Sequence, residues 1–525
     1  MQLTTRYVRY ICFFAILCLT TILYGCSVLN LSKQSVSLVR VLSINEGQFF
    51  ANQVTRENTE YEVEGDFDLE GGIVAIPEGC TLIFKGGSVS NGTLLGNKTL
   101  IVREQDEPVF KDVMLKGTFR SSGEFSINAY SSNKLDYFYS FIQAFSGTPL
   151  YLSDDYSVTE YEGISDGAMP QSIEIDGRGH KLTLYSLGAY KVLQCKMKNI
   201  TIECRNNITP RNNWKQDSFT FGIVGSFEKS SLELNNVTFT KECGFAYFRG
   251  FKKLEISQCK EDGSYFFIYD CNDVSFHHNI IVNAPMGYYS IGKMTEAGKV
   301  KIYNNQFNNI NAGGIILTGG LKYNVDISNN VLDQVGSGGA TNACINIHPR
   351  GTINVSNNMI VANKGAVTLD IDAAKEVFYS NETSVVVDNN IIENVAGDLS
   401  LHCLALVGLA QLYVRNNTIK DQVFYFWDTP YMEFCGNTMA YSKGFDKSIS
   451  IGKMSTHKVT EQMVYQHIFK DNVFDIPYAN SYVTFQYLSK AKVRIIGANN
   501  TYSKPVNFID QYKRFEASGD IRIYK

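Results

Sequence analysis

Short runs of alternating aliphatic and polar residues, each ending in paired asparagines, recur along the second half of the chain. An example is Val355-Ser356-Asn357-Asn358-Met359. The second asparagines of successive copies are 25, 28, 32 and 27 residues apart, along the series Asn305, Asn330, Asn358, Asn390 and Asn417. A period in the twenties with loops of varying length predicts a solenoid of stacked repeats.

Further copies extend the pattern in both directions. Paired asparagines also occur at Asn235–Asn236 and Asn499–Asn500, and single asparagines at Asn279, Asn437 and Asn472. Asparagine tolerates the left-handed backbone of a tight corner, and stacked side-chain amides can hydrogen-bond along the axis. The repeats are not helical, because they hold no sustained 3.6-residue apolar stripe. A leucine-rich repeat is excluded because its leucine frame is missing and β-branched residues dominate.

A second apolar strand precedes the asparagine strand in each repeat, as at residues 314–318, 344–348, 366–370 and 403–406. Strand, corner, strand and return strand predict three sheets. This pattern resembles the right-handed parallel β-helix proteins of the pectate-lyase-like superfamily, over residues 171–525. The resemblance implies an all-β, right-handed parallel β-helix and leaves the reaction open, since one fold hosts many chemistries.

Two further segments precede this array. Residues 27–130 form a β-rich module of short strands with Gly-Gly and Asn-Gly turns, which resembles modules that precede β-helices in gut Bacteroidetes proteins. Residues 131–170 hold a capping helix and the strand leading into the array. Apolar residues fit one face of a helix over Asn133–Phe145, and Gly147 and Pro149 end it. Such a helix would cover the open end of the sheets.

Residues 1–26 have the features of a targeting segment. Arg6 and Arg9 precede the apolar stretch Ile11–Leu23, and Cys26 follows it. The segment resembles the signal of a bacterial lipoprotein, in which Cys26 is lipidated, although Tyr24 is larger than the residue usual there. An uncleaved anchor and a simple secretion signal are the alternatives. The expected location is the bacterial cell envelope, as an outer-membrane lipoprotein held in the membrane by its lipid.

Composition narrows the range of partners. The net charge is −4 and charged residues make up 19% of the chain, so the basic footprint of a nucleic-acid-binding protein is missing. Aromatic residues make up 13%, which suits stacking on sugar rings as well as core packing. The 12 cysteines include no Cys-x-x-Cys pair, so no metal site is expected from them.

The candidate catalytic residues lie on the outward face of the first strand of each repeat. Alternation predicts that Ile345, Ile347 and Leu369 point inward and that their neighbours point outward. His348 and Asp370 are 22 residues apart, which predicts that they stack on adjacent strands. The next outward residues on these strands, two positions further on, are Arg350 and Asp372, and a repeated Ser-Ile-Gly-Lys-Met motif adds a lysine. The candidate catalytic residues are therefore His348, Arg350, Asp370, Asp372 and Lys293.

Two reactions suit this group. Lytic cleavage of a uronic-acid polymer needs a cation beside the carboxylate and a base, roles open to Arg350, Lys293 and His348. Hydrolysis needs two carboxylates, for which Asp370 and Asp372 are the candidates. No cofactor is expected, and the acids on this sheet that could bind calcium are Asp370, Asp372 and Glu376.

Other outward residues are expected to contact the sugar. They are Arg249, Tyr269, Tyr288, Asn346, Tyr425 and Trp427. We therefore expect an exported polysaccharide lyase or glycoside hydrolase that binds a glycan along one sheet. The alternatives are a non-catalytic surface glycan-binding protein or adhesin, and a spacer or coat protein without a glycan ligand.

Overall fold

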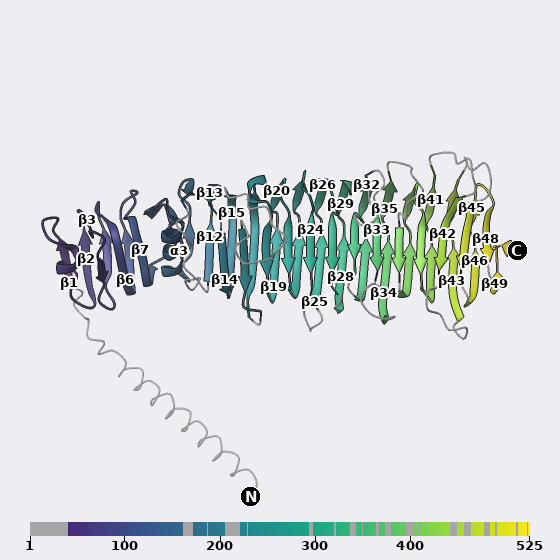
Figure 1. The fold of residues 1–525 in the computed structure, drawn as a ribbon, viewed down its shortest axis with the longest axis horizontal. Coiled ribbons are helices and arrows are strands. Elements are labelled where there is room, and N and C mark those ends of the chain that lie inside the picture. Colours follow the sequence, from purple (N-terminus) through teal and green to yellow (C-terminus); the bar gives the residue numbers. More distant parts are fainter. Residues whose placement is uncertain are drawn as a thin grey trace, which may run out of the picture.

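The computed structural model of the chain is an elongated all-β array in which every strand pairing is parallel (Figure 1). The structure describes residues 40–160, 172–185, 187–204, 221–227, 229–292, 298–319, 322–336, 343–348, 350–363, 367–372, 380–394, 404–407, 409–441, 449–455, 464–476, 483–488, 491–510, 513–521 and 523–524. The expected signal segment and Cys26 lie outside these residues. No helix among them is long and apolar enough to cross a membrane.

An eight-stranded parallel sheet occupies the N-terminal end of the array. Its strands are β1 (Arg40–Ile44), β2 (Thr59–Val63), β3 (Asp66–Asp68), β4 (Ile73–Ala75), β5 (Thr81–Phe84), β6 (Ser88–Arg103), β7 (Phe110–Ser121) and β9 (Tyr130–Ser131). The short helix α2 (Phe50–Gln53) connects β1 to β2. Strand β8 (Phe125–Ser126) and the 3-10 turn η1 (Ile127–Ala129) lie between β7 and β9.

The expected helix is present as α3 (Leu135–Ala144), and it packs against β7. Its buried residues follow the predicted apolar face and also include Phe141 and Ala144. Phe141 stacks on Tyr130 with ring centroids 4.9 Å apart, and Phe145 stacks on Phe125 at 4.6 Å. The helix therefore joins the N-terminal sheet to the strands that follow through aromatic packing.

Beyond α3, most repeats contribute three strands. The first lies in a 14-stranded sheet made of β14 (Leu187–Val192), β16 (Phe221–Gly225), β18 (Ala246–Arg249), β21 (Phe266–Tyr269), β24 (Tyr288–Ile291), β27 (Ile315–Thr318), β30 (Ile345–Ile347), β33 (Leu369–Asp372), β36 (Leu404–Val407), β39 (Phe424–Trp427), β42 (Ile449–Ser455), β45 (Val483–Leu488), β48 (Val506–Asp510) and β50 (Ile523–Tyr524).

The second strand of each repeat leads into the corner, and in the repeats from β22 to β46 this corner carries a ladder asparagine. These strands are β10 (Leu150–Tyr151), β12 (Ser172–Asp176), β15 (Gln194–Cys204), β17 (Ser231–Phe239), β19 (Lys253–Ser257), β22 (Asp273–His277), β25 (Gly298–Tyr303), β28 (Lys322–Ser328), β31 (Arg350–Ser356), β34 (Ser380–Asp388), β37 (Leu409–Arg415), β40 (Tyr431–Cys435), β43 (Val464–Lys470), β46 (Lys492–Ala498) and β49 (Phe515–Ser518). Each pairs with the corresponding strand of the next repeat.

The third strand follows the corner. These strands are β11 (Tyr156–Val158), β13 (Lys181–Leu184), β20 (Lys260–Asp262), β23 (Ile280–Val282), β26 (Gln306–Ile310), β29 (Val331–Val335), β32 (Met359–Ala362), β35 (Ile391–Asn394), β38 (Thr418–Lys420), β41 (Thr438–Ala440), β44 (Val473–Asp475) and β47 (Thr501–Tyr502). Strands β15 and β17 are long enough to run through both positions, and a 3-10 turn η3 (Lys241–Cys243) follows β17. The expectation of parallel strands on both sides of the corner is confirmed.

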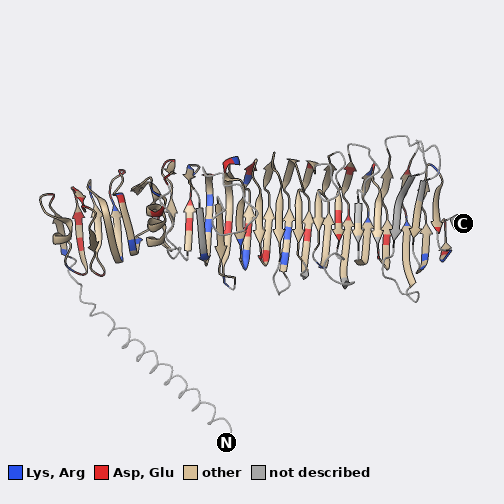
Figure 2. Cartoon of the chain, viewed as in Figure 1, with Lys and Arg blue, Asp and Glu red and all other residues tan. Residues whose placement is uncertain are grey.

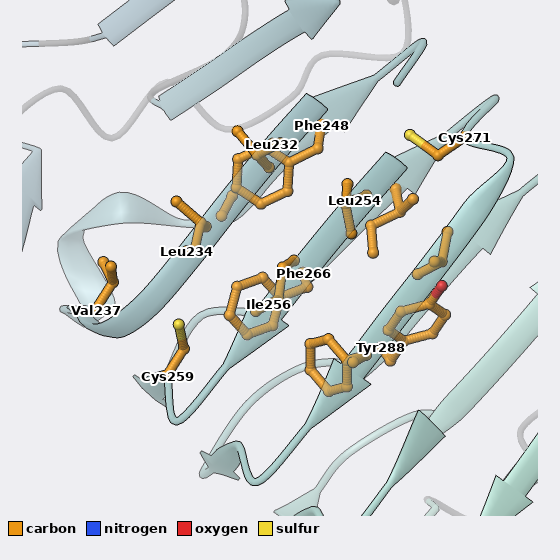
Figure 3. Packing of buried hydrophobic residues seen from close by; sticks show 14 of the residues in the cluster. Leu232, Leu234, Val237, Phe248, Leu254, Ile256, Cys259, Phe266, Cys271 and Tyr288 are labelled. Atoms are coloured by element: carbon orange, nitrogen blue, oxygen red, sulfur yellow. The ribbon is translucent and has the colours of Figure 1, made fainter. Parts of the chain in front are cut away.

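The interior between the sheets is filled by one continuous hydrophobic core. Figure 3 shows part of it, where Leu232, Leu234 and Ile256 of the corner strands meet Phe248, Phe266 and Tyr288 of the 14-stranded sheet. Alternation sets the core residues, since every second residue of each strand points inward.

Nine asparagines form a hydrogen-bonded ladder along the corners, in which each side-chain amide donates both of its protons. In Asn358, Nδ2 donates to Oδ1 of Asn390 at 3.0 Å and to the Ile327 carbonyl at 2.9 Å, while Oδ1 accepts from Nδ2 and the backbone N–H of Asn330. The ladder runs through Asn279, Asn305, Asn330, Asn358, Asn390, Asn417, Asn437, Asn472 and Asn500, and it ends on the carboxylate of Asp520.

The two residues of each corner have separate roles. The residue before the ladder asparagine has a left-handed backbone, with φ of 57° at Asn357 and 55° at Asp471. The three single-asparagine copies are therefore complete, because His278, Gly436 and Asp471 supply the corner. The copy at Asn235–Asn236 is offset: Asn236 has the left-handed φ of 54°, and Val237 follows where other repeats have a ladder amide.

Glu261 is a carboxylic acid inside the hydrophobic core. It pairs in register with Phe239 on one side and Ile281 on the other, and it is fully buried. The Ser264 hydroxyl donates to Oε2 at 2.8 Å, and Oε1 has no hydrogen-bond partner among the described residues. Burial raises the pKa of Glu261 well above its ordinary value. The folded protein therefore holds this side chain in its neutral form.

We expect Asn358→Ala to lower the free energy of unfolding by about 3–5 kcal/mol, because it leaves buried donors and acceptors on both sides unpaired. Asn357→Ala, at the exposed corner beside it, should cost only about 1–2 kcal/mol for its left-handed backbone. Urea denaturation measures both. Equal losses in the two variants would show that the ladder amides do not dominate.

Glu261→Gln should raise the free energy of unfolding relative to wild type, and this gain should be larger at high pH than at low pH. With a folded-state pKa above the unfolded one, the wild-type contribution is full below the unfolded pKa of about 4.3 and is lost as pH rises above it. The neutral amide lacks this dependence, so the gain of the variant should be larger at pH 8 than at pH 4, by on the order of 1 kcal/mol or more. Urea midpoints at both pH values measure it.

The exposed Glu233, half of whose side chain remains accessible, supplies a matched control as Glu233→Gln. A pH-independent difference between Glu261→Gln and wild type would contradict a buried neutral acid.

Candidate functional site

The outer face of the 14-stranded sheet carries two columns of side chains. In β27, Ile315 and Leu317 are buried in the core, whereas Ile316 and Thr318 face outward and are half-buried. In-register pairing aligns the outward residues of successive strands. The first column is Tyr247, Phe267, Tyr289, Ile316, Asn346, Asp370 and, two strands beyond Asp370, Tyr425. The second holds Arg249, Tyr269, Ile291 and Thr318, and further along Asp372.

An aromatic cluster lies on this outer face over β18, β21 and β24. Phe245, Tyr247 and Phe267 are buried there, in a group separate from the core, and Tyr265, Tyr269 and Tyr289 surround them with part of their surface exposed. The rings of Phe267 and Tyr289 stack with centroids 5.0 Å apart and an interplanar angle of 10°. Phe245 stacks on Tyr265 at 5.5 Å. This cluster is a rigid aromatic surface outside the core.

The cluster combines one cation with neutral phenols. The guanidinium of Arg249 lies over the Tyr269 ring, 4.9 Å from its centroid. Burial raises the pKa of Tyr247 to about 12, against the opposing charge of Arg249, and burial likewise raises the pKa of Tyr265 to about 12. Both hydroxyls therefore stay protonated at neutral pH and can donate hydrogen bonds.

Further along the same columns lies an acidic pair, Asp370 and Asp372. Both are half-buried and project from the outward face of β33, so their Cα atoms are about 6.5–7 Å apart. Asn346 sits beside Asp370 in the first column and is 9% exposed. Its Oδ1 has no hydrogen-bond partner among the described residues.

The register corrects the predicted stacking of His348 on Asp370. Asn346 pairs with Asp370 and Ile347 with Ile371, so His348, directly after β30, lies level with Asp372. The prediction assumed that residues 22 apart stack on adjacent strands. Paired residues of β30 and β33 are instead 24 apart in sequence, as Asn346 and Asp370 are. His348 is half-buried.

Arg350 is not on this face. It begins β31, a corner strand, where it pairs with Lys322. The prediction failed because β30 holds only three residues, so the chain leaves the 14-stranded sheet before reaching Arg350. Of the two cations expected beside the acidic pair, Arg350 therefore lies on another sheet, and Lys293 lies outside the described residues.

Tyr288 was predicted to face outward and instead belongs to the core. Figure 3 shows it in the interior with Phe266, its partner in register, and it is fully buried. The neighbouring Tyr289 takes the outward position. A Tyr-Tyr pair satisfies the alternation in either phase, so the sequence does not choose between them.

The remaining predicted residues divide between the outward face and the segments outside the described part. Arg249, Tyr269, Asn346 and Tyr425 are on the outward face, and Trp427 has its backbone in β39. Lys293 and Glu376 lie outside the described residues, as does the Trp427 side chain. Sequence reasoning missed Phe245, Tyr265 and Tyr289, for which the signal was the density of aromatics between residues 245 and 289.

Charge does not single out another surface in the view of Figure 2, where basic and acidic residues are interspersed along the described strands. Among these residues, one group of three could hold a cation: Asp154, Asp155 and His180, with ligand atoms within 4.8 Å of one another. This group is far along the chain from Asp370 and Asp372, the acids considered for calcium.

Comparison with known proteins adds no relative. No family model, curated protein or solved structure matches the chain. Function must therefore be inferred from the outer face itself.

Proposed function

We propose that the array is a right-handed parallel β-helix of the pectate-lyase-like type. Three observations support this: every pairing is parallel, each strand pairs with its counterpart one repeat later, and the asparagine corners stack in one line. The right-handed form is favoured because connections between parallel strands of one sheet are right-handed in nearly all proteins.

We further propose that the protein binds a polysaccharide along the outer face of the 14-stranded sheet. The aromatic cluster carries this proposal, because large aromatic side chains gathered outside a core suit the apolar faces of sugar rings. Tyr265, Tyr269 and Tyr289 offer accessible ring surface, and Arg249 adds a donor for hydroxyl or carboxylate oxygens. Asn346 and the acidic pair extend the polar contacts along the same columns.

Hydrolysis of the bound glycan is the second candidate function. Asp370 and Asp372 supply two carboxylates on one face of β33, the minimum set for acid and base or nucleophile. Lytic cleavage has less support, because Arg350 lies on another sheet.

Export as a lipoprotein belongs to the same proposal and rests on the sequence of residues 1–26. A polysaccharide-binding protein in the cell envelope would be anchored there through Cys26. Labelling with a fatty-acid analogue in a bacterial host should mark the wild type, and Cys26→Ser should remove the label. Labelling that persists in Cys26→Ser would exclude lipidation at this residue.

Glycan binding should depend on the aromatic cluster. We expect Tyr269→Ala and Tyr289→Ala each to weaken binding to a responsive polysaccharide by up to about tenfold, the usual worth of one aromatic contact. Affinity electrophoresis against neutral and acidic polysaccharides would measure it. Tyr413→Ala is the matched control, since Tyr413 is half-buried on a corner strand with Arg415 4.4 Å from its ring centroid.

Turnover is assayed on the same panel by reducing ends and by absorbance at about 235 nm from unsaturated products. Reducing ends alone that disappear in Asp370→Asn with binding retained would establish hydrolysis. Binding without either product would leave a glycan-binding protein. Equal binding losses in Tyr413→Ala and Tyr269→Ala, or no binding across the panel, would refute the proposed face.

A further inference from the structure

Two adjacent histidines lie at the corner between β22 and β23, outside the 14-stranded sheet that carries the aromatic cluster. His278 occupies the left-handed position that asparagine fills in other repeats, with φ of 57°, and it is exposed. His277 precedes it and keeps 17% of its side chain accessible. Their Nδ1 atoms are 2.9 Å apart. No other described corner brings two imidazoles together.

The surrounding contacts hold both rings in place. The His277 ring stacks on Tyr303 of the next repeat, with centroids 4.7 Å apart and an interplanar angle of 15°. Its Nε2 faces Glu255 Oε1 of the preceding repeat at 3.7 Å. Nε2 of His278 lies 3.2 Å from Nδ2 of the Asn304 side-chain amide, which donates to it. Both rings are thus oriented by residues of the neighbouring repeats, with their Nδ1 atoms turned toward each other.

This arrangement has the features of a metal chelate. A ligating imidazole in a protein usually donates its second N–H to a carboxylate or carbonyl oxygen, which fixes the ring and strengthens the ligand. Here Glu255 stands at the second nitrogen of His277 and Asn304 at that of His278. An ion bound between the Nδ1 atoms would displace the proton of the hydrogen bond that now joins them. That proton would move to Nε2 of His278, and the Asn304 amide would flip so that its oxygen accepts from Nε2.

The separation of the two nitrogens selects among metals. Two nitrogens about 2.0 Å from an ion are about 2.8 Å apart at the right angle of a tetragonal complex and about 3.3 Å apart in a tetrahedral one. The hydrogen-bonded nitrogens, 2.9 Å apart, are already close to the tetragonal separation. Cu²⁺ is the ion chosen because it binds nitrogen ligands more tightly than the other divalent ions of its row.

We propose that His277 and His278 chelate a divalent copper ion at this corner, with water completing the coordination. The site does not depend on the proposed glycan face, since it involves none of its residues. Glu255 acts as a positioning residue for His277.

The test is titration of the purified protein with Cu²⁺ in a non-coordinating buffer, followed by calorimetry and by electron paramagnetic resonance. Wild type should bind one tight equivalent with nitrogen hyperfine structure. His277→Ala and His278→Ala should each weaken this binding by more than about tenfold, and Glu255→Gln by about tenfold or less. Zn²⁺ should bind more weakly than Cu²⁺.

His180→Ala is the matched control, because His180 belongs to the separate group with Asp154 and Asp155. It should leave the tight equivalent unchanged. Circular dichroism of each variant verifies the fold. Absence of a tight equivalent in wild type, its loss in His180→Ala, or its survival in both His277→Ala and His278→Ala would overturn the proposal.

Discussion

The buried asparagine ladder is the constraint on which the rest of the array depends. Each amide donates both of its protons, and every amide after Asn279 also accepts two hydrogen bonds, so a shift of one repeat against the next would leave buried donors and acceptors unpaired. Hydrophobic packing alone would resist a slip of one residue but would permit a slip of two. The ladder removes that freedom, because only one register aligns the amides.

Because the register between repeats is fixed, the outward side chains of successive strands align in columns. These columns determine which residues meet on the outer face. Aromatic side chains of three successive strands meet over β18, β21 and β24, although up to 44 residues separate Phe245 from Tyr289 in sequence. Asn346 meets Asp370 by the same rule, while Arg350 is carried onto another sheet. The candidate glycan face and the histidine corner are both products of stacking between repeats.

Much of the fold could be predicted from the sequence because its signals are local. The asparagine corners, the alternation around them and the helix ahead of the array each depend on residues within one short segment. The outer face could be predicted less well, because its composition depends on how many residues separate successive strands. His348 was misaligned for this reason, and Tyr288 because a Tyr-Tyr pair fits either phase. The burial of Glu261 could not be predicted from the sequence, since an acidic residue in a strand ordinarily points outward.

The ladder also has a direction, and this limits how the protein can change in length. Every ladder amide donates one hydrogen bond to the next ladder residue on its C-terminal side and the other to a backbone carbonyl of the preceding repeat. The series ends at Asp520, whose carboxylate accepts from Asn500 and has no proton to donate further. If a repeat were duplicated and inserted between two ladder asparagines, its own asparagine would accept from the Nδ2 before it and donate to the Oδ1 after it. An asparagine in a repeat added beyond Asp520 would have no side-chain donor before it, because the Asp520 carboxylate carries no proton. Evolution by internal duplication is therefore open to this array, whereas extension of the same ladder past Asp520 first requires that residue to be replaced.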